Sequence, residues 1–422
     1  MPFYARMIKS SKQTTKLQTA KMVANRSLDQ WLALLEVKHN KKIDLGLSRI
    51  QQVYKHCIKD KIATTIFTVA GTNGKGSTVA ILSAICQQAG YKVGEFTSPH
   101  ILSFNERIRI NSVNASDKDI IAAFEIIDKN LNGVSLSYFE YATLAAFIIF
   151  AQQGLDIAIL EVGLGGRLDS VNAIDTDCAI ITTIDIDHTS WLGDNRESIG
   201  FEKAGIMRKN TPIIYGDDDC PQSIINHAKN IGAKLISSDV FDQKKYHKPN
   251  LRGQYQYKNA ATAIAAIKAI KSLNINRAHI NAGLQNIQLD GRLQLISNNP
   301  QIYVDVAHNK QAAKSLQQWL SNNLVKGKTI AVFAVLADKL AIDWLHLFTD
   351  SIDCWCISSV DSPRALPRQQ LLQQLADNAQ LLVSFETITE AFTAAKSMLE
   401  IDHDRIIVFG SFYTVSAVMG IQ

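Results

Sequence analysis

The residues Gly71–Ser77, which read Gly-Thr-Asn-Gly-Lys-Gly-Ser, place a lysine and a hydroxyl among glycines. They follow a β-branched and aromatic run, Thr65–Val69, and precede Thr78–Ala89, whose apolar residues recur at helical spacing. A strand, a glycine loop and a helix in this order bind phosphate, because backbone N–H groups and the helix N-terminus converge on an anion. Lys75 can reach the outer phosphates, and the Ser77 hydroxyl suits Mg²⁺. The expected phosphate-binding residues are Asn73, Gly74, Lys75, Gly76 and Ser77.

The spacing differs from the usual nucleotide-binding loop, G-x-x-x-x-G-K-[ST]. Val69 stands at the first glycine position, and Gly76 separates Lys75 from Ser77. A chance glycine-rich turn is the alternative interpretation. Strand, loop, lysine, hydroxyl and helix nevertheless coincide, which favours phosphate binding.

Three further polar residues stand where later strands are expected to end: Ser98, Glu161 and His188. In open α/β sheets ligands bind beyond the carboxyl ends of the strands, so these side chains are expected on one rim with Lys75. A carboxylate, a hydroxyl and an imidazole suit a Mg²⁺ ion that bridges nucleotide phosphates. Taken singly, Glu161 could instead end a salt bridge and His188 could cap a helix.

A second glycine-rich motif, Glu-Val-Gly-Leu-Gly-Gly-Arg-Leu-Asp, covers Glu161–Asp169 and predicts a loop that lines the substrate. A tight strand-to-helix turn is the alternative. Polar residues farther along, Asn259, Arg292 and Asp305, could approach a nucleotide from the other side. Asp305 alone is equally consistent with a helix cap and with a ligand.

Composition indicates a soluble globular protein with two domains or three. The chain has 422 residues, a formal charge of +5, 46% hydrophobic and 20% charged residues. Its dispersed basic residues do not imply nucleic-acid binding, and no apolar stretch is long enough to span a membrane. Six cysteines without a pairing framework fit a reducing compartment, and we expect a cytoplasmic monomer. Cys354 and Cys356 share one face of an apolar strand, where burial is favoured over a metal or redox role.

Alternating apolar strands and helices predict an α/β protein with parallel sheets covered on both faces. We expect a basic N-terminal extension at 1–26, a P-loop-type parallel-sheet ATP-binding domain at 27–290, and a smaller Rossmann-like C-terminal domain at 291–422. The polar stretch 217–250 is expected to form loops. A strand is expected at 178–184 and a helix at 196–207.

The motifs together carry a resemblance. GTNGKGS, TSPH, SYFEYAT, LEVGLGGRLDS, DHTSWLG, EKAG, GxxQxxN and DVAHN resemble the folylpolyglutamate synthase/dihydrofolate synthase family of Mur-type ligases, from about Leu28 to Val415. The resemblance implies ATP-dependent addition of L-glutamate to a pterin-derived acid, with phosphate, metal and nucleotide contacts at the residues named above. Lys203, in EKAG, matches a lysine that this family carbamylates, and a carbamate could bind a second Mg²⁺.

The resemblance also implies where the folate substrates bind. It favours a bifunctional enzyme that makes dihydrofolate from dihydropteroate and extends reduced folates, over a folylpolyglutamate synthase only, a peptidoglycan-precursor ligase or a nucleotide-switch protein. Three departures from the family pattern fall at Asp290, at Leu340 and at Tyr413, which replace a proline, an acid and a histidine. The implied substrate residues are Lys42, Ile43, Asp44, Leu45, Ser137, Tyr138, Phe139, Glu140, Leu168, Asp169, Ser170 and His308.

Overall fold

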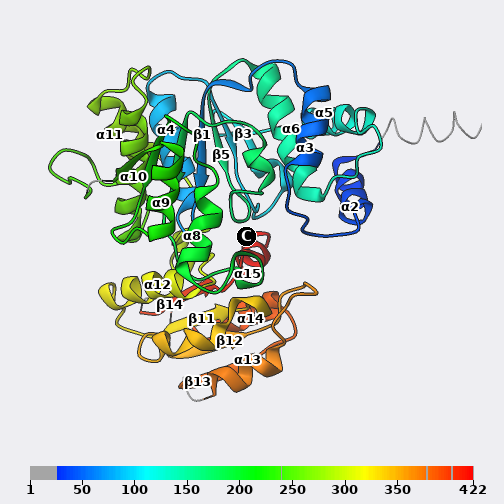
Figure 1. Ribbon diagram of the computed structural model, residues 1–422. Helices are drawn as coiled ribbons and strands as arrows, with labels where there is room; N and C mark the ends of the chain where they lie inside the picture. The colour runs from blue at the N-terminus through cyan, green and yellow to red at the C-terminus, as the bar shows by residue number, and fades with distance from the viewer. Residues whose placement is uncertain (1–25, 239, 377–378, 401–402, 422) are drawn as a thin grey trace, which may run out of the picture. The chain divides into compact units, whose positions relative to one another are not determined.

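A computed structural model describes residues 26–238, 240–376, 379–400 and 403–421 (Figure 1). The expected extension at 1–26 lies outside these residues except for Arg26. The described chain divides into two compact units. One contains the residues up to Ile62 together with Ala115–Gly154, and the other contains Ala63–Asn114 and the residues from Leu155 onward.

The first unit is helical. Its helices are α2 (Leu28–Lys38), α3 (Ser48–Cys57), α5 (Asp117–Lys129) and α6 (Tyr138–Gln153). Capping boxes start α2 and α6, where Ser27 pairs with Gln30 and Ser137 pairs with Glu140. The core contains three aromatic side chains in contact: the Phe124 ring centroid lies 5.8 Å from that of Trp31, with the rings tilted, and 6.1 Å from that of Tyr141, with the rings edge to face.

The second unit contains an eight-stranded sheet in the order β4-β3-β2-β5-β1-β6-β7-β8. The six neighbouring strands β2, β5, β1, β6, β7 and β8 are parallel, and the short strands β3 and β4 add an antiparallel edge. Nearly continuous apolar runs such as β1 form here because both faces of the central strands are buried. The bounds are β1 Ala63–Ala70, β2 Val93–Phe96, β3 Ile108–Ile110, β4 Val113–Asn114, β5 Leu155–Glu161, β6 Cys178–Ile181, β7 Pro212–Tyr215 and β8 Lys234–Ser237.

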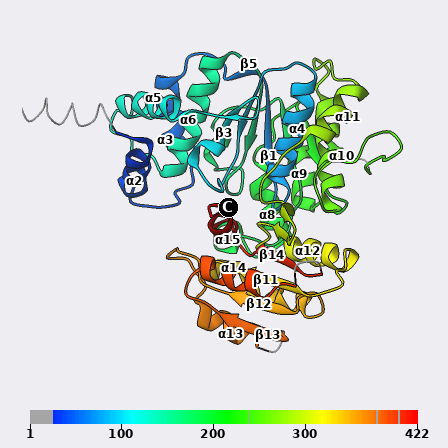
Figure 2. The ribbon, with the colours of Figure 1, turned by 180° about the vertical axis from the view of Figure 1, so that it is seen from behind.

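Helices of the same unit cover this sheet. On one face α4 (Lys75–Gln88) packs with α10 (Tyr255–Ala269) and α11 (Arg277–Asn286), and both views show the three helices together (Figures 1 and 2). Apolar residues of α8 (Arg196–Ala204) and α9 (Gln222–Ile231) join a second cluster with β6 and β7. The short helix α7 (Thr189–Leu192) follows the loop after β6.

A six-stranded sheet in the same unit has the order β13-β12-β11-β14-β10-β9, parallel except for the edge strand β9. Helices α12 (Lys310–Asn322) and α13 (Arg368–Leu375) pack on one face, and α14 (Ile388–Ser397) and α15 (Phe412–Met419) pack on the other. The bounds are β9 Gln294–Asn298, β10 Gln301–Val304, β11 Thr329–Phe333, β12 Cys354–Ile357, β13 Leu381–Ser384 and β14 Arg405–Phe409.

The α/β fold class with parallel sheets is confirmed, and several local predictions are wrong. The stretch 217–250 contains α9 and β8 rather than loops alone. The strand expected at 178–184 ends at Ile181, and the helix expected at 196–207 ends at Ala204 before Gly205. Cys354 and Cys356 are buried in the core beneath α14, as packing predicts. In the described part of the chain, no helix has the length and apolar character needed to cross a bilayer.

Candidate functional site

The glycine loop connects β1 to α4 as the sequence predicts, and Lys75 is the first residue of the helix. Gly74 precedes it with φ +84°, and a Cβ there would lie 2.4 Å from Asn259 Oδ1. Gly71 is equally constrained, because a Cβ would lie 1.8 Å from the Thr182 hydroxyl. No side chain caps the start of α4. Its first backbone N–H groups are therefore available to an anion.

Lys75 folds back over the loop. Its Nζ donates to the carbonyls of Gly71 at 3.0 Å and Thr72 at 3.3 Å. Desolvation lowers the pKa of Lys75, and the nearby carboxylates of Glu161 and Asp187 oppose that shift. Lys75 therefore lies close to two carboxylates while its ammonium is still held by the phosphate loop.

The Ser77 hydroxyl is buried and has no hydrogen-bond partner among the described residues. Buried polar atoms are nearly always paired in folded proteins. An unpaired hydroxyl in the first turn of α4, next to the glycine loop, therefore indicates a ligand that supplies the missing contact.

Glu161 ends β5 beside the phosphate loop, paired in register with Val69 of β1. Its Oε2 accepts the backbone N–H of Ser98 at 3.2 Å, so Ser98 contacts it through the main chain. A Cβ on Gly76 would lie 3.7 Å from the same oxygen and 3.5 Å from an Arg292 nitrogen. Burial raises the pKa of Glu161, and Lys75 and the Ser98 N–H oppose the rise. The structure thus brings Ser98, Glu161 and Arg292 to the start of α4.

His188 lies in the loop after β6 rather than at a strand end, because the strand stops at Ile181. Its backbone adopts the left-handed conformation, with φ 53° and ψ 39°. Burial lowers the pKa of His188 to about 4, with Lys339 acting in the same direction. Its imidazole is therefore neutral near pH 7, which is the form that binds a metal.

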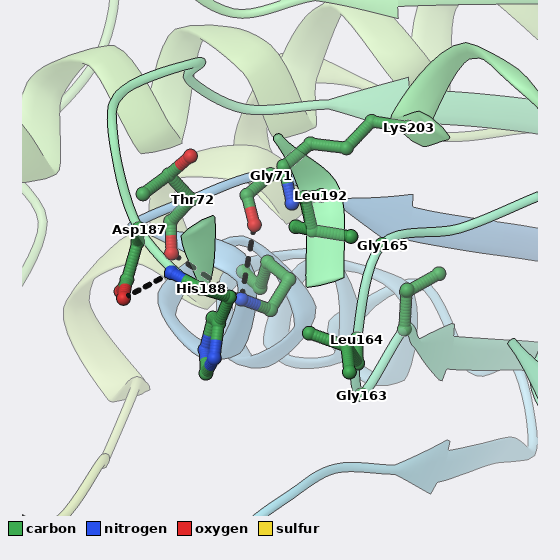
Figure 3. A pocket seen from close by; sticks show the side chains of 11 residues that line it. Gly71, Thr72, Gly163, Leu164, Gly165, Asp187, His188, Leu192 and Lys203 are labelled. Carbon is green, nitrogen blue, oxygen red and sulfur yellow. Dashed lines mark hydrogen bonds between the residues drawn. The ribbon is translucent and has the colours of Figure 1, made fainter. Parts of the chain in front are cut away.

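A pocket between the phosphate loop and the second glycine motif is lined by Lys75, His188 and Lys203, together with Gly163 and Gly165 (Figure 3). Lys203 is 4% exposed. Desolvation lowers the pKa of Lys203 to about 7, and Lys75 acts in the same direction. A buried amine that is partly neutral at pH 7 is a nucleophile, as carbamylation requires.

The second glycine motif forms a turn that packs on the end of α8. A Cβ on Gly166 would lie 3.1 Å from Lys203 Cα, and Arg167 pairs with Glu202 at 2.8 Å. Asp169 is 1% exposed and accepts the backbone N–H groups of Leu164 and Val171 at 2.8 and 3.0 Å. Burial raises its pKa to about 6. The carboxylate of Asp169 therefore shapes the turn, with the half-buried Leu168 and the buried Ser170 on either side of it.

The six-stranded sheet brings Arg292 and Asp305 to the same region. The Arg292 guanidinium lies 5.2 Å from the Phe412 ring centroid. Asp305 caps no helix: it accepts the backbone N–H of Leu293 at 2.8 Å and of Ala307 at 2.7 Å. Burial raises the pKa of Asp305 to about 6, and Arg292 opposes the rise. The Asp305 carboxylate thus fixes the loop from which Arg292 projects.

Asp187, which sequence reasoning did not select, lies at the centre of a polar cluster. Its Oδ1 accepts Lys339 Nζ at 2.7 Å, and its Oδ2 accepts Asn309 Nδ2 at 3.0 Å. His308 Nε2 lies 3.8 Å from Oδ2, and the ring's other nitrogen lies 2.7 Å from the Val306 carbonyl. Lys339 and the two neighbouring histidines hold the pKa of Asp187 well below its ordinary value despite its burial.

In the first unit, the predicted substrate residues fall on the loop after α2 and at the start of α6. Asp44 accepts Arg49 NH1 at 2.9 Å, and the His39 ring lies 3.1 Å away. Glu140 Oε2 accepts the N–H and hydroxyl of Ser137 at 2.8 and 2.9 Å, so one oxygen is used for capping. Arg49 Nε lies 3.2 Å from the other oxygen and links the two segments. Lys42 and Ile43 are exposed, and Leu45, Tyr138 and Phe139 are half-buried.

The chain is similar to known proteins along most of its length. The Mur ligase middle domain matches residues 69–276, and the Mur ligase glutamate ligase domain matches 291–412. The dihydrofolate synthase/folylpolyglutamate synthase of Escherichia coli is 38% identical over 405 residues, which cover 93% of this chain and 94% of that protein. The chain belongs to this family of ligases.

Solved structures of family members superpose closely on the chain. The Escherichia coli FolC complex with DHPP and ADP is 38% identical, with a TM-score of 0.88 over 94% of this chain and 98% of that one. A bifunctional folylpolyglutamate synthase/dihydrofolate synthase with Mn, AMPPNP and L-glutamate bound is 39% identical, with a TM-score of 0.87 and the same coverage.

The residues present in this family member fit a nucleotide with a divalent cation. The described residues include no cluster of three His, Cys, Asp or Glu side chains. Glu161 and the unpartnered Ser77 hydroxyl supply oxygen ligands next to the loop, and phosphate oxygens can complete a Mg²⁺ shell. Lys75 and Arg292 supply the positive charge that a polyphosphate requires.

Proposed function

We propose that the protein is an ATP-dependent ligase that joins L-glutamate to dihydropteroate, forming dihydrofolate, and extends reduced folates with further glutamates. The observation that carries this proposal is the unpaired Ser77 hydroxyl, which is buried in the first turn of α4 next to the glycine loop. Family membership supports the acid substrates, because relatives with this fold bind DHPP, ADP and L-glutamate.

The nucleotide phosphates bind the backbone of Asn73, Gly74 and Gly76, and Asn259, Arg292 and Asp305 contribute from the other elements. Ser77, Ser98, Glu161 and His188 hold Mg²⁺, which supplies charge neutralisation at the phosphates. Lys75 and Arg292 stabilise negative charge as the substrate carboxylate attacks the γ-phosphorus.

The attack releases ADP and gives an acyl phosphate on the substrate. The amine of glutamate then attacks the acyl carbon, phosphate leaves with the bonding electrons, and the amine loses its proton. No protein nucleophile is required, so the residues contribute through binding, orientation and exclusion of water.

We also propose that Lys203 is carbamylated. Its Nζ bonds to the carbon of CO₂ and loses a proton, which converts a buried cation into an anion that can hold a second Mg²⁺. Desolvation supports the step, since it lowers the pKa of Lys203 to about 7.

The substrate side of the proposal rests on three segments: 42–45, 137–140 and 168–170. We assign them, with His308, to the folate and glutamate substrates. The proposed domain limits are 27–290 for the ATP-binding part and 291–422 for the C-terminal part. A cytoplasmic monomer completes the proposal.

Purified protein with ATP, Mg²⁺ and L-glutamate tests these assignments against two acids, dihydropteroate and a reduced folate monoglutamate. The proposal predicts phosphate release with both acids, and product masses that each increase by one glutamyl residue. Extension of the folate alone would establish a folylpolyglutamate synthase only. Phosphate release that ignores both acids would indicate a nucleotide switch.

A further inference from the structure

The Asp187 carboxylate connects the loop of His188 to the six-stranded sheet. Its Oδ1 accepts the backbone N–H of His188 at 2.8 Å and Lys339 Nζ at 2.7 Å. Lys339 lies in the segment after β11, and its side chain is only 5% exposed. Figure 3 shows Asp187 and His188 side by side on one loop, with the bond between them. Asp187 Oδ1 therefore accepts one hydrogen bond from a loop of the eight-stranded sheet and one from a loop of the six-stranded sheet.

A second contact fixes the other oxygen. Asn309 donates its Nδ2 to Asp187 Oδ2 at 3.0 Å and, at 3.1 Å, to Oδ1 of Asn73 in the phosphate loop. Asn73 returns a hydrogen bond to Asn309 Oδ1 at 3.1 Å, and that oxygen also accepts the N–H of Ala312 as the cap of α12. The Asn309 amide is thus fully used, and its orientation is fixed.

His188 needs an external restraint to hold its backbone. A left-handed conformation costs a non-glycine residue about 1–2 kcal/mol, and such residues persist where surrounding contacts determine them. The N–H of His188 is restrained by Asp187 Oδ1, and that oxygen is restrained by Lys339. The His188 backbone is therefore linked through one carboxylate oxygen to a residue 151 positions farther along the chain.

We propose that Asp187 is a positioning residue that couples the six-stranded sheet to His188, so that the contact with Lys339 sets the orientation of the imidazole. The proposal rests on the proposed function, which assigns His188 as a metal ligand. If the contact between Asp187 and Lys339 only stabilised the fold, breaking it would lower stability but would leave metal affinity unchanged.

Four variants separate these interpretations. Asp187→Asn and Lys339→Met each remove one charge of the pair, and each leaves its partner buried and uncompensated. The double variant removes both charges, so it keeps the comparison interpretable if a single variant unfolds. The matched control is Asp338→Asn, which changes the neighbouring carboxylate that binds the exposed Arg364 at 2.8 Å.

Two readouts are measured for each variant: steady-state kinetics, and Mn²⁺ affinity with a non-hydrolysable ATP analogue by electron paramagnetic resonance of free Mn²⁺. We expect each single variant to lower kcat at least 20-fold and to weaken Mn²⁺ about tenfold, with KM for ATP within threefold of wild type. The kcat and Mn²⁺ affinity of the double variant should lie within threefold of those of the more impaired single variant, because both changes break the same connection. Asp338→Asn should match wild type within twofold.

Unchanged Mn²⁺ affinity in Asp187→Asn would overturn the proposal, and so would losses that multiply in the double variant. Failure of the proposed function is a separate result: wild-type protein would then show no acid-dependent phosphate release. In that case the Mn²⁺ comparison alone still decides whether Asp187 acts through His188.

Discussion

Lys203 is expected to take up CO₂ as a carbamate at mildly alkaline pH, whereas exposed lysines of the chain are not. Only the neutral amine reacts, and desolvation lowers the pKa of Lys203 from 10.5 to about 7, with Lys75 acting in the same direction. At pH 8 an amine with a pKa of 7 is about 90% neutral, and one with a pKa of 10.5 is about 0.3% neutral. The reactive fraction is therefore roughly 300-fold larger at Lys203.

The sign of the pH dependence follows from the same shift. As pH falls through 7, Lys203 gains a proton, so the reactive amine is lost and carbamate formation declines. Carbamate content and turnover should therefore fall together between pH 8 and pH 6 in buffers of fixed CO₂ content. They should recover together when the protein is returned to pH 8.

The assay is ¹³C NMR of protein equilibrated with ¹³C-bicarbonate at pH 8. We expect a carbamate signal in wild type and its absence in Lys203→Met, together with a loss of turnover of at least 100-fold in that variant. Lys229→Met, at an exposed position of α9, is the matched control and should retain both. Active wild-type protein without a signal that depends on Lys203 would refute the reasoning.

Three further predictions test other parts of the structure. Gly74→Ala places a Cβ 2.4 Å from Asn259 Oδ1, so KM for ATP should rise at least tenfold. The control is Gly90→Ala, where φ is similar but the added Cβ meets open space. That variant should lose only about 1–2 kcal/mol of unfolding free energy in urea. Equal KM values in the two would contradict the predicted clash. Glu161→Gln should keep wild-type circular dichroism and lower kcat by 100- to 1,000-fold, and near-normal turnover would remove its assigned role. The buried Arg405 guanidinium donates to the Thr329 hydroxyl and to backbone carbonyls at the end of α12. Arg405→Met should therefore lower the free energy of unfolding in urea by about 2–4 kcal/mol without raising KM for ATP. An unchanged urea midpoint would refute this structural role.

The glycine loop and its flanking elements were predictable because their signals are local. Gly71–Ser77 follows an apolar strand and leads into a helix in one short stretch, and the structure has that order. Glu161 was predictable for the same reason, as the end of a continuous apolar run. Both inferences needed only sequence neighbours and the rule that ligands bind at the carboxyl ends of parallel strands.

Other features were present in the sequence but were outweighed by composition. The polar character of 217–250 suggested loops, although Ile224, Ala228 and Ile231 recur at helical spacing and Gly232 follows as a left-handed C-cap. Similarly, Ser137 and Glu140 form an S-x-x-E capping box, which explains why one Glu140 oxygen is used at the start of α6.

The Asp187 cluster had no local signal. Lys339 lies 152 residues away, and the two side chains meet only because both sheets place their connecting loops in one region. The pKa values of Lys203 and His188 likewise depend on burial that no sequence spacing reveals. Such features become visible only when tertiary structure is known.

The position of β14 has a consequence for how the protein is synthesised. It is the last described strand in the chain, yet it lies inside its sheet, between β11 and β10. A nascent chain that has not yet released Arg405–Phe409 from the ribosome leaves β10 and β11 with open edges, which are prone to mispairing. Lys339 follows β11, so we expect it to be held in place only after β14 has been synthesised and has paired with β11. An incomplete chain can fold its phosphate loop early, but it should not assemble the full ligase site.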